Sequence, residues 1–297
     1  MTTIGFIGLG IMGRPMARQL LLKGTPLLIY DIDQEAVKDL TASGAVSATL
    51  AEIGRSCPII FLILPSGNIV RQVLFDQDGL CTAIQSGTVI VDMSSVTPQD
   101  SQICAQRLQP MGVRFLDAPV SGGEPKAIDG TLSFMVGGDQ ADFDQVLPYF
   151  KKMGSNATLV GQTGSGSVTK LANQIIVNLT IAAISEAMVL ACKAGVDPDK
   201  VYQAIRGGLA GSTVLDAKVP KMIHRDFKAG GKLSINHKDI RNVMLTAKEL
   251  GVPLPFSSQL LDVMQNLMDR QLQDDDHAGI VKYFEKLADV TVQSQPD

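Results

Sequence analysis

Metal ligands and disulfide partners are scarce in this sequence of 297 residues. Its four cysteines are scattered and form no C-x-x-C pair, so we expect neither a disulfide framework nor a zinc–thiolate site, as is typical of a reducing compartment. Its three histidines have neither the spacing of a catalytic triad nor that of a metal site, and we expect no metal. These residues are Cys57, Cys81, Cys104, Cys192, His224, His237 and His277.

An excess of positive charge is also missing. The chain has 26 Lys and Arg against 30 Asp and Glu, a formal net charge of −4, which argues against nucleic acid or an anionic membrane surface as the main partner. Residues 1–3 contain no basic residue, unlike the start of a secretory signal. The most apolar stretches are 58–65, which is short, and 175–192, which contains Asn178 and Glu186. We expect neither to span a bilayer, and we expect a cytoplasmic location.

Hydrophobic residues make up 45% of the sequence and charged residues 19%, a balance typical of a globular protein with a sizeable core. In the first half, apolar runs alternate with helix-like segments. Because the runs contain no polar alternation, they predict parallel strands covered on both faces, and hence a doubly wound α/β sheet. The expected strands cover 4–8, 26–30, 59–64, 88–92 and 113–117, and the expected helices cover 12–23, 34–43 and 98–109.

From about Gly164 onward, helical periodicity replaces the strand-like runs and predicts an all-helical second domain. Its first helix, 168–195, is long enough, at about 1.5 Å per residue, to lead out of the first domain and form the spine of the second. We therefore expect two domains, residues 1–163 and 164–297. The other helices are expected at 198–207, 211–224, 237–250, 257–270 and 279–287.

The first predicted strand ends in a G-x-G-x-x-G motif that also opens the first predicted helix. Its residues are Gly8, Leu9, Gly10, Ile11, Met12 and Gly13. In this setting the first glycine permits a tight turn, the second lets a pyrophosphate approach the backbone, and the third lets helix and strand pack closely. The N–H groups and the dipole at the start of the helix stabilise phosphates. The motif therefore predicts a dinucleotide-binding site.

The type of dinucleotide is indicated by the end of the next predicted strand. Asp31 lies there, about 20 residues after the motif, where a carboxylate can accept hydrogen bonds from the ribose hydroxyls. Asp33 follows, and residues 31–33 include no Lys or Arg, so a 2′-phosphate would meet negative charge. NAD(H) is therefore favoured over NADP(H), which stays an alternative because Arg14 could turn toward a phosphate.

A second polar group lies at the start of the long apolar helix. Gly166, Lys170 and Asn173 are spaced i, i+4 and i+7, which places them on one helical face. From the spacing alone, Lys170 is either a functional residue or a lysine whose stem lies along an apolar surface at a domain hinge.

Four segments, in order along almost the whole chain, together resemble the β-hydroxyacid dehydrogenase family. Residues 5–16 are similar to its dinucleotide motif, 117–123 to its substrate-binding motif, 166–173 to its catalytic motif, and 237–240 to its distal Lys-Asp element. The resemblance implies a Rossmann domain, a long interdomain helix and an all-helical C-terminal domain that also mediates oligomerisation, and the apolar helices of the second half favour a homodimer or homotetramer. It also implies reversible hydride transfer between a β-hydroxyacid and its semialdehyde or ketoacid.

The resemblance also implies roles for individual residues. Lys170 would exchange a proton with the substrate oxygen. Ser121, Gly122 and Gly123 would hold the substrate carboxylate, and Asn173 would orient the substrate. The cofactor side would include Leu64, Pro65, Ser95 and Lys238.

Within the family, residues 121–131 and 205–218 resemble the branch that reduces tartronate semialdehyde (2-hydroxy-3-oxopropanoate) to glycerate. The second segment is rich in small and hydroxyl residues, and such a wall suits a substrate with an extra hydroxyl. One alternative is a 3-hydroxyisobutyrate dehydrogenase or another short-chain semialdehyde oxidoreductase. Another is a dinucleotide-sensing homologue without activity, although sensing relatives lack the lysine that stands here at Lys170.

Overall fold

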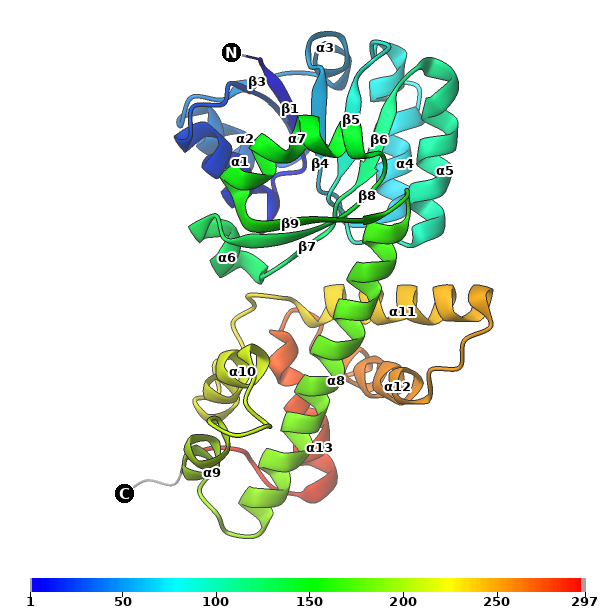
Figure 1. The fold of residues 1–297 in the computed structure, drawn as a ribbon. Coiled ribbons are helices and arrows are strands. Elements are labelled where there is room, and N and C mark those ends of the chain that lie inside the picture. Colours follow the sequence, from blue (N-terminus) through cyan, green and yellow to red (C-terminus); the bar gives the residue numbers. More distant parts are fainter. Residues whose placement is uncertain (1, 295–297) are drawn as a thin grey trace. The chain divides into compact units, whose positions relative to one another are not determined.

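The computed structural model describes residues 2–294, which form two compact units that meet in the sequence between Lys170 and Leu171. Figure 1 shows strands and helices in the first unit. The described part of the second unit contains helices and loops but no strand. The predicted combination of a doubly wound, mostly parallel sheet with an all-helical C-terminal part is therefore confirmed.

Within residues 2–294, the first unit holds one nine-stranded sheet in the order β3-β2-β1-β4-β5-β6-β8-β7, with β9 paired to β8. The strands predicted from the sequence are all present and run parallel to one another. They are β1 (Ile4–Ile7), β2 (Leu27–Tyr30), β4 (Ile59–Leu62), β5 (Val89–Asp92) and β6 (Arg114–Asp117). The short β3 (Val46–Ser47) adds a parallel strand beyond β2.

Three further strands were not predicted: β7 (Val120–Ser121), β8 (Leu132–Gly137) and β9 (Gly154–Gly161). β8 runs antiparallel to β6 and β7 and parallel to β9. Glycine and polar residues interrupt these segments, so none of them has the continuous apolar run of β4 or β5. They form a sheet extension next to β6, and β7 carries Ser121.

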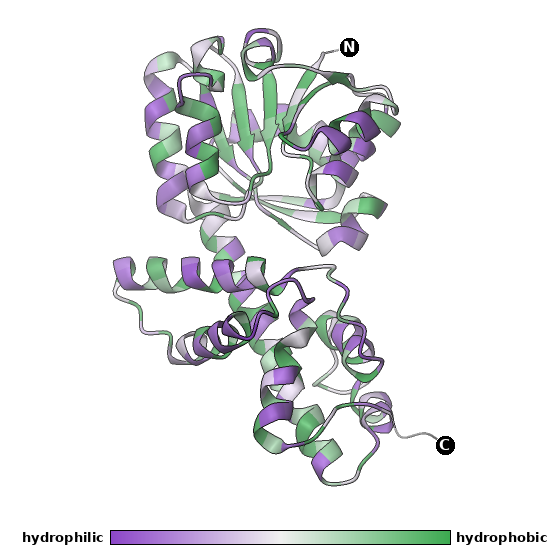
Figure 2. Cartoon of the chain, turned by 180° about the vertical axis from the view of Figure 1, so that it is seen from behind, coloured by the Kyte–Doolittle hydropathy of each residue, from purple (hydrophilic) through white to green (hydrophobic). Residues whose placement is uncertain are grey.

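Helices cover both faces of the sheet, and an apolar core lies on each side. One face is covered by α1 (Gly13–Leu22), α2 (Gln34–Thr41), α6 (Gly123–Asp129) and α7 (Gln140–Met153). The other is covered by α3 (Leu50–Ser56), α4 (Gly67–Phe75) and α5 (Pro98–Leu108). In Figure 2 the central strands are mostly green, the colour of apolar residues. Burial on both sides explains why these strands lack polar alternation.

The local sequence sets where two of these helices begin. α5 starts with a capping box in which the Thr97 side chain accepts from the Asp100 backbone and the Asp100 side chain accepts from the Thr97 backbone, with Pro98 in the first turn. α3 starts with the same arrangement of Thr49 and Glu52. The first of these helices was predicted from the sequence, whereas the second is a short helix that was not.

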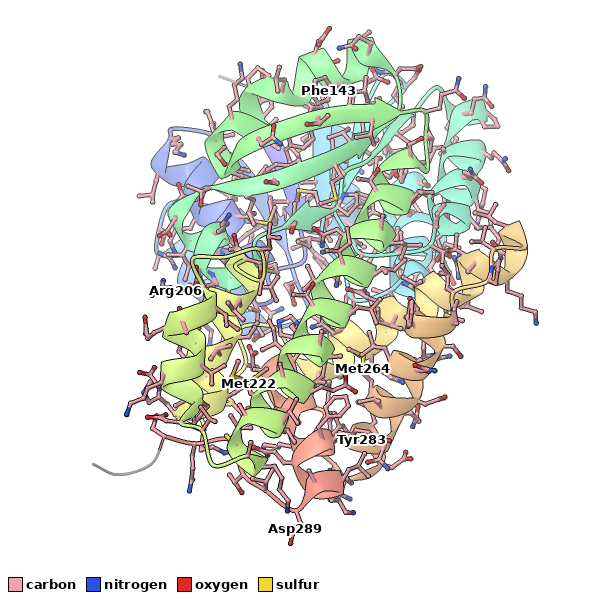
Figure 3. The ribbon with its side chains drawn as sticks, turned by 60° about the horizontal axis from the view of Figure 1, so that its bottom comes forward. Phe143, Arg206, Met222, Met264, Tyr283 and Asp289 are labelled. Carbon is pink, nitrogen blue, oxygen red and sulfur yellow. The ribbon has the colours of Figure 1, made fainter. Side chains whose placement is uncertain are left out.

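The second unit is built around most of α8 (Ser165–Lys193), a helix of 29 residues that begins in the first unit. The buried side of α8 shares one core with the other helices of this unit. Figure 3 labels two residues of that core, Met222 and Met264, and both are fully buried. The other helices are α9 (Pro198–Ile205), α10 (Thr213–Ile223), α11 (Leu233–Leu250), α12 (Pro255–Asp269) and α13 (Val281–Ala288), and short 3₁₀ turns cover Leu80–Thr82, Gln109–Met111 and His277–Ile280.

The helices of the second unit were all predicted, with one clear difference in extent. α11 begins at Leu233, before the predicted start at His237. Leu233 is fully buried, so the apolar side of α11 starts one turn earlier than predicted, ahead of the mostly polar residues 234–238.

α8 meets a test of length and composition that the core helices of globular proteins also meet, so the expectation that it does not span a bilayer stays a prediction. Among the described residues it is the one helix that is long and apolar enough, by length and composition, to cross a membrane. Asn178 and Glu186 therefore do not disqualify it on that criterion. Part of its apolar surface lies in the core of the second unit, where Ile181 and Met188 are fully buried. Another part is exposed in the single chain, including Ile176 at 67% and Leu190 at 73%.

Candidate active site

The glycine-rich turn has the backbone geometry that its motif predicts. Gly8 has a φ of +98°, and a Cβ there would lie 2.2 Å from the Ile63 carbonyl oxygen. A Cβ on Gly13 would lie 1.9 Å from the carbonyl oxygen of Gly8, so only glycine permits this contact between the helix and the turn. By contrast, a Cβ on Gly10 would have no atom within 4 Å. The packing of the protein therefore does not require Gly10, and the open space beside it can admit a pyrophosphate.

The start of α1 favours an anion. Met12, which precedes the helix, makes no side-chain capping hydrogen bond, and the first turn contains no acidic residue. The first N–H groups of the helix thus have no carboxylate cap, and the positive end of the helix dipole lies at the glycine-rich turn. The residues present therefore fit the phosphates of a dinucleotide.

Asp31 lies directly against this turn. One of its carboxylate oxygens accepts a hydrogen bond from the backbone N–H of Leu9, and the other accepts from the N–H of Asp33 at 2.8 Å. Arg14 also lies near, with nitrogens 3.9 Å from an Asp33 oxygen and 4.0 Å from an Asp39 oxygen. Arg14, the cation that could attract a 2′-phosphate, therefore already lies beside the carboxylates of Asp33 and Asp39.

The ends of β4 and β5 continue this edge of the sheet. The N–H of Leu64 donates to the Ser94 hydroxyl at 2.8 Å, and the N–H of Ser94 donates to the Asp92 carboxylate at 2.9 Å. The predicted cofactor residue Leu64 is thereby joined to Ser94, the chain neighbour of the predicted residue Ser95, and Pro65 follows Leu64 in the chain. Sequence reasoning missed Ser94 and Asp92, each only 1% exposed. The sequence signal that could have found them is that the apolar run of β5 ends in the polar residue Asp92, with Ser94 two residues later.

Lys170 lies against the segment that carries the predicted substrate residues. Its Nζ donates a hydrogen bond to the Val120 carbonyl oxygen at 2.9 Å. Val120 begins the segment 120–123, called the 120–123 loop below, in which the chain passes from β7 (Val120–Ser121) through Gly122 to Gly123 at the start of α6. Both glycines have a positive φ, +140° at Gly122 and +68° at Gly123. The structure thus brings Lys170 together with this loop, although 50 residues separate it from Val120.

A buried carboxylate that sequence reasoning did not single out lies between these parts. Asp117, the last residue of β6, accepts hydrogen bonds at 2.7 Å from the N–H of Gly164 and at 2.7 Å from the N–H of Ser167. Burial raises the pKa of Asp117 to about 7, although these hydrogen bonds act to lower it. A Cβ on Gly166 would lie 2.5 Å from the Asp117 carbonyl oxygen. Gly166 is therefore needed for the close packing of α8 on β6.

In the second unit, the predicted residues Asn173 and Lys238 are joined through two others. Asn173 Nδ2 donates to Gln174 Oε1 at 3.0 Å, and Gln174 Nε2 donates to the Asp239 carboxylate at 2.6 Å. The second oxygen of Asp239 lies 3.1 Å from Lys238 Nζ. Gln174 and Asp239 are both buried and were missed, although each stands next to a residue that was named.

The three histidines belong to different elements of the second unit. His224 caps the C-terminus of α10, and His277 Nδ1 lies 3.3 Å from the side-chain oxygen of Asn178. His237 is buried between α11 and α12, and this burial lowers its pKa, while a hydrogen bond with Gln265 acts to raise it. Across residues 2–294, no group of three or more His, Cys, Asp or Glu side chains could hold a metal ion.

Two family models match the chain. One, described as the NAD binding domain of 6-phosphogluconate dehydrogenase, matches residues 3–161. The other, described as the NAD-binding domain of NADP-dependent 3-hydroxyisobutyrate dehydrogenase, matches residues 164–284. Together they include the glycine-rich turn, the 120–123 loop and the start of α8.

Similar proteins cover nearly the whole chain but differ in the substrates that they are named for. The chain is 42% identical to 2-hydroxy-3-oxopropionate reductase of Escherichia coli strain K12, over 96% of this chain and 98% of the relative. It is 34% identical to 2-(hydroxymethyl)glutarate dehydrogenase of Eubacterium barkeri, over 97% of each. Among solved structures, 3-hydroxyisobutyrate dehydrogenase from Salmonella typhimurium matches with a TM-score of 0.86 and 30% identity, over 95% of this chain and 99% of that one.

Proposed function

Because the chain belongs to the β-hydroxyacid dehydrogenase family of NAD(P)-dependent oxidoreductases, we propose that it reduces tartronate semialdehyde reversibly to D-glycerate. The observation that carries the proposal is the hydrogen bond of 2.9 Å from Lys170 Nζ to the 120–123 loop. In this proposal residues 1–163 bind the dinucleotide, and residues 164–297 serve the substrate and oligomerisation.

Lys170 is the acid–base group of the proposed reaction. A bound nicotinamide dinucleotide supplies the hydride for reduction and accepts it in oxidation. In the reductive direction the Lys170 ammonium gives a proton to the carbonyl oxygen while the aldehyde carbon gains the hydride, so that C=O becomes CH–OH. In the oxidative direction neutral Lys170 takes the hydroxyl proton back. The presence of this lysine also favours an enzyme over a dinucleotide-sensing homologue.

The 120–123 loop holds the substrate carboxylate in this proposal. The Ser121 hydroxyl and the N–H groups of Gly122 and Gly123 are the donors, since successive backbone N–H groups in a turn with positive φ can form an anion-binding concavity. Asn173 orients the hydroxyl or carboxylate of the substrate, and its link to Gln174 supports a defined amide orientation. Lys238 serves the cofactor side, restrained by Asp239.

The substrate assignment rests on the polar segments 121–131 and 205–218 and on the relative with 42% identity that is named 2-hydroxy-3-oxopropionate reductase. We would measure kcat/KM with tartronate, methylmalonate and succinate semialdehydes. A preference of about 100-fold for the hydroxylated substrate would support the proposal, because a site built to bind a hydroxyl rejects analogues that lack it. Equal or better rates with methylmalonate semialdehyde would instead favour 3-hydroxyisobutyrate dehydrogenase, the name of the similar Salmonella typhimurium structure.

NADH is the cofactor favoured by the charges near the ribose position. Asp31 contacts the glycine-rich turn, and Asp33 and Asp39 flank Arg14, so a 2′-phosphate would meet three carboxylates. NADPH remains the alternative cofactor. The ratio of kcat/KM for NADH to that for NADPH tests this assignment, and a ratio below one would reject it.

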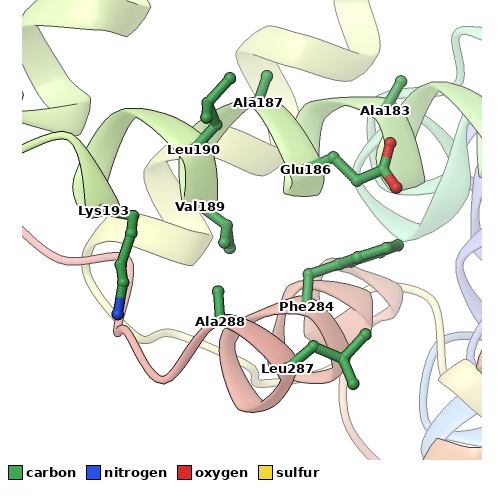
Figure 4. A pocket seen from close by; sticks show the side chains of 9 residues that line it. All are labelled: Ala183, Glu186, Ala187, Val189, Leu190, Lys193, Phe284, Leu287 and Ala288. Atoms are coloured by element: carbon green, nitrogen blue, oxygen red, sulfur yellow. The ribbon is translucent and has the colours of Figure 1, made fainter.

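We also propose that the protein assembles as a homodimer or homotetramer and is located in the cytoplasm. Figure 4 shows the side chains that line a groove between α8 and α13, most of them apolar, such as Leu190 and Phe284. The groove has a volume of about 650 Å³. None of the residues assigned above to substrate or cofactor lines this groove. Glu186 and Lys193 also line it, and an antiparallel α8 from a second copy would place opposite charges face to face. Light scattering after size-exclusion chromatography measures the number of chains.

A further inference from the structure

Asp117 connects two parts of the proposed site. Its main chain leads from β6 directly into the 120–123 loop, while its side chain contacts the start of α8. The side chain is only 1% exposed. A charged group is this deeply buried only where specific partners offset the loss of hydration.

The partners of Asp117 are the first N–H groups of α8. One carboxylate oxygen accepts from Gly164 and the other from Ser167, each at 2.7 Å. The carboxylate thus caps the helix from a distant strand, and its charge complements the positive end of the helix dipole. Both oxygens are engaged in this way, so this one side chain attaches the first turn of α8 to the end of β6.

Close packing makes this attachment rigid. A Cβ on Gly166 would lie 2.4 Å from the Met135 carbonyl oxygen and 2.5 Å from the Asp117 carbonyl oxygen. A Cβ on Gly137 would lie 2.5 Å from an oxygen of the Asp117 carboxylate. The first turn of α8 therefore rests on β6 and β8 without space for an alternative position.

Lys170 lies one helical turn beyond Ser167, and its Nζ reaches Val120, three residues after Asp117 in the chain. Asp117 is thus linked to Ser167 by a hydrogen bond, Ser167 to Lys170 by one turn of α8, and Lys170 by a hydrogen bond to Val120, which follows Asp117 in the chain. We propose that Asp117 is a positioning residue whose carboxylate holds the Lys170 amine at the 120–123 loop. This inference rests on the proposed role of Lys170 as the proton donor.

The test compares Asp117→Asn with a matched control, Asp142→Asn. Asp142 is also a buried aspartate of the first unit, but its partner is Arg114 at the start of β6. At pH 8 we expect D117N to lower kcat for semialdehyde reduction by about 100-fold, because a misplacement of about 1 Å has an effect of this size. NADH affinity, measured by fluorescence, should stay unchanged. D142N should lower the melting temperature and keep kcat.

A double-mutant cycle with Lys170→Ala separates positioning from general stability. If Asp117 acts through Lys170, D117N should lower the residual kcat of K170A no further. Losses that multiply, or a D117N enzyme with normal kcat, would overturn the inference. Normal turnover by K170A would instead reject the proposed function and leave the fold unaffected.

A second variant keeps the test decisive if D117N does not fold. Gly166→Ala retains the Asp117 charge but places a Cβ against the Met135 and Asp117 carbonyl oxygens, which displaces the first turn of α8. We expect the same outcome, a loss of kcat with unchanged NADH affinity. A G166A enzyme with normal kcat would show that the position of this turn does not control Lys170.

Discussion

The replacement Lys170→Met tests the core of the proposed mechanism. Methionine keeps most of the apolar stem of lysine but removes the ammonium group. Lys170 Nζ donates a hydrogen bond to the Val120 carbonyl oxygen at 2.9 Å, and the loss of such a bond costs about 1 kcal/mol of stability. The variant should therefore fold and melt only a few degrees below the parent protein.

The effect on catalysis should be much larger than the effect on stability. A positioned general acid contributes about 10²- to 10⁴-fold to the rate, which corresponds to about 3–5 kcal/mol of activation free energy. K170M should lose kcat by this factor in both directions of the reaction. NADH affinity should persist, because the glycine-rich turn and Asp31 are untouched. Stopped-flow absorbance of NADH gives kcat, and fluorescence titration gives the dissociation constant.

The matched control is Lys126→Met, on the exposed side of α6 just after the 120–123 loop. It removes the same charge near the same loop, and its kcat should stay close to that of the parent protein. If K170M and K126M lost activity equally, the rate would depend on local positive charge and the role of Lys170 as proton donor would be wrong. A K170M enzyme with parental kcat would contradict the mechanism directly.

Three further predictions concern the cofactor site, pH and assembly. Gly10→Ala should weaken NADH binding without loss of stability, since its Cβ fills open space, whereas Gly13→Ala should lower the melting temperature because its Cβ meets the Gly8 backbone; calorimetry and fluorescence titration distinguish the two. Burial raises the pKa of Asp117 to about 7, so the folded chain holds this proton more tightly than the unfolded chain. The free energy of unfolding should therefore fall as pH rises from about 4 through about 7. In urea melts across this pH range, the unfolding free energy of D117N should change less with pH than that of the parent protein. Leu190→Asp places a charge in the exposed apolar groove and should shift the protein to monomers in light scattering, with no change if α8 is not an interface.

The sequence by itself determined the features whose physical cause is local. The strands β4 and β5 could be predicted because burial on both faces of a sheet requires an unbroken apolar run. The roles of Gly8 and Gly13 could be predicted because the G-x-G-x-x-G spacing encodes a turn and a close helix–strand contact. The helix-rich second half followed from its periodicity in the same way. The resemblance of four segments to one family then named Lys170 before any contact was known.

Only the tertiary structure decided which distant side chains meet. Asp117 and Ser167 are 50 residues apart, and Gln174 and Asp239 are 65 apart, so no local pattern signals either contact. β7, β8 and β9 were missed because polar residues break the apolar pattern of their segments, which become strands only when they pair in the part of the sheet next to β6. Local sequence sets which conformations a segment prefers. The partner of a buried carboxylate is set by the packing of the whole chain, because burial makes an unpaired charge too costly.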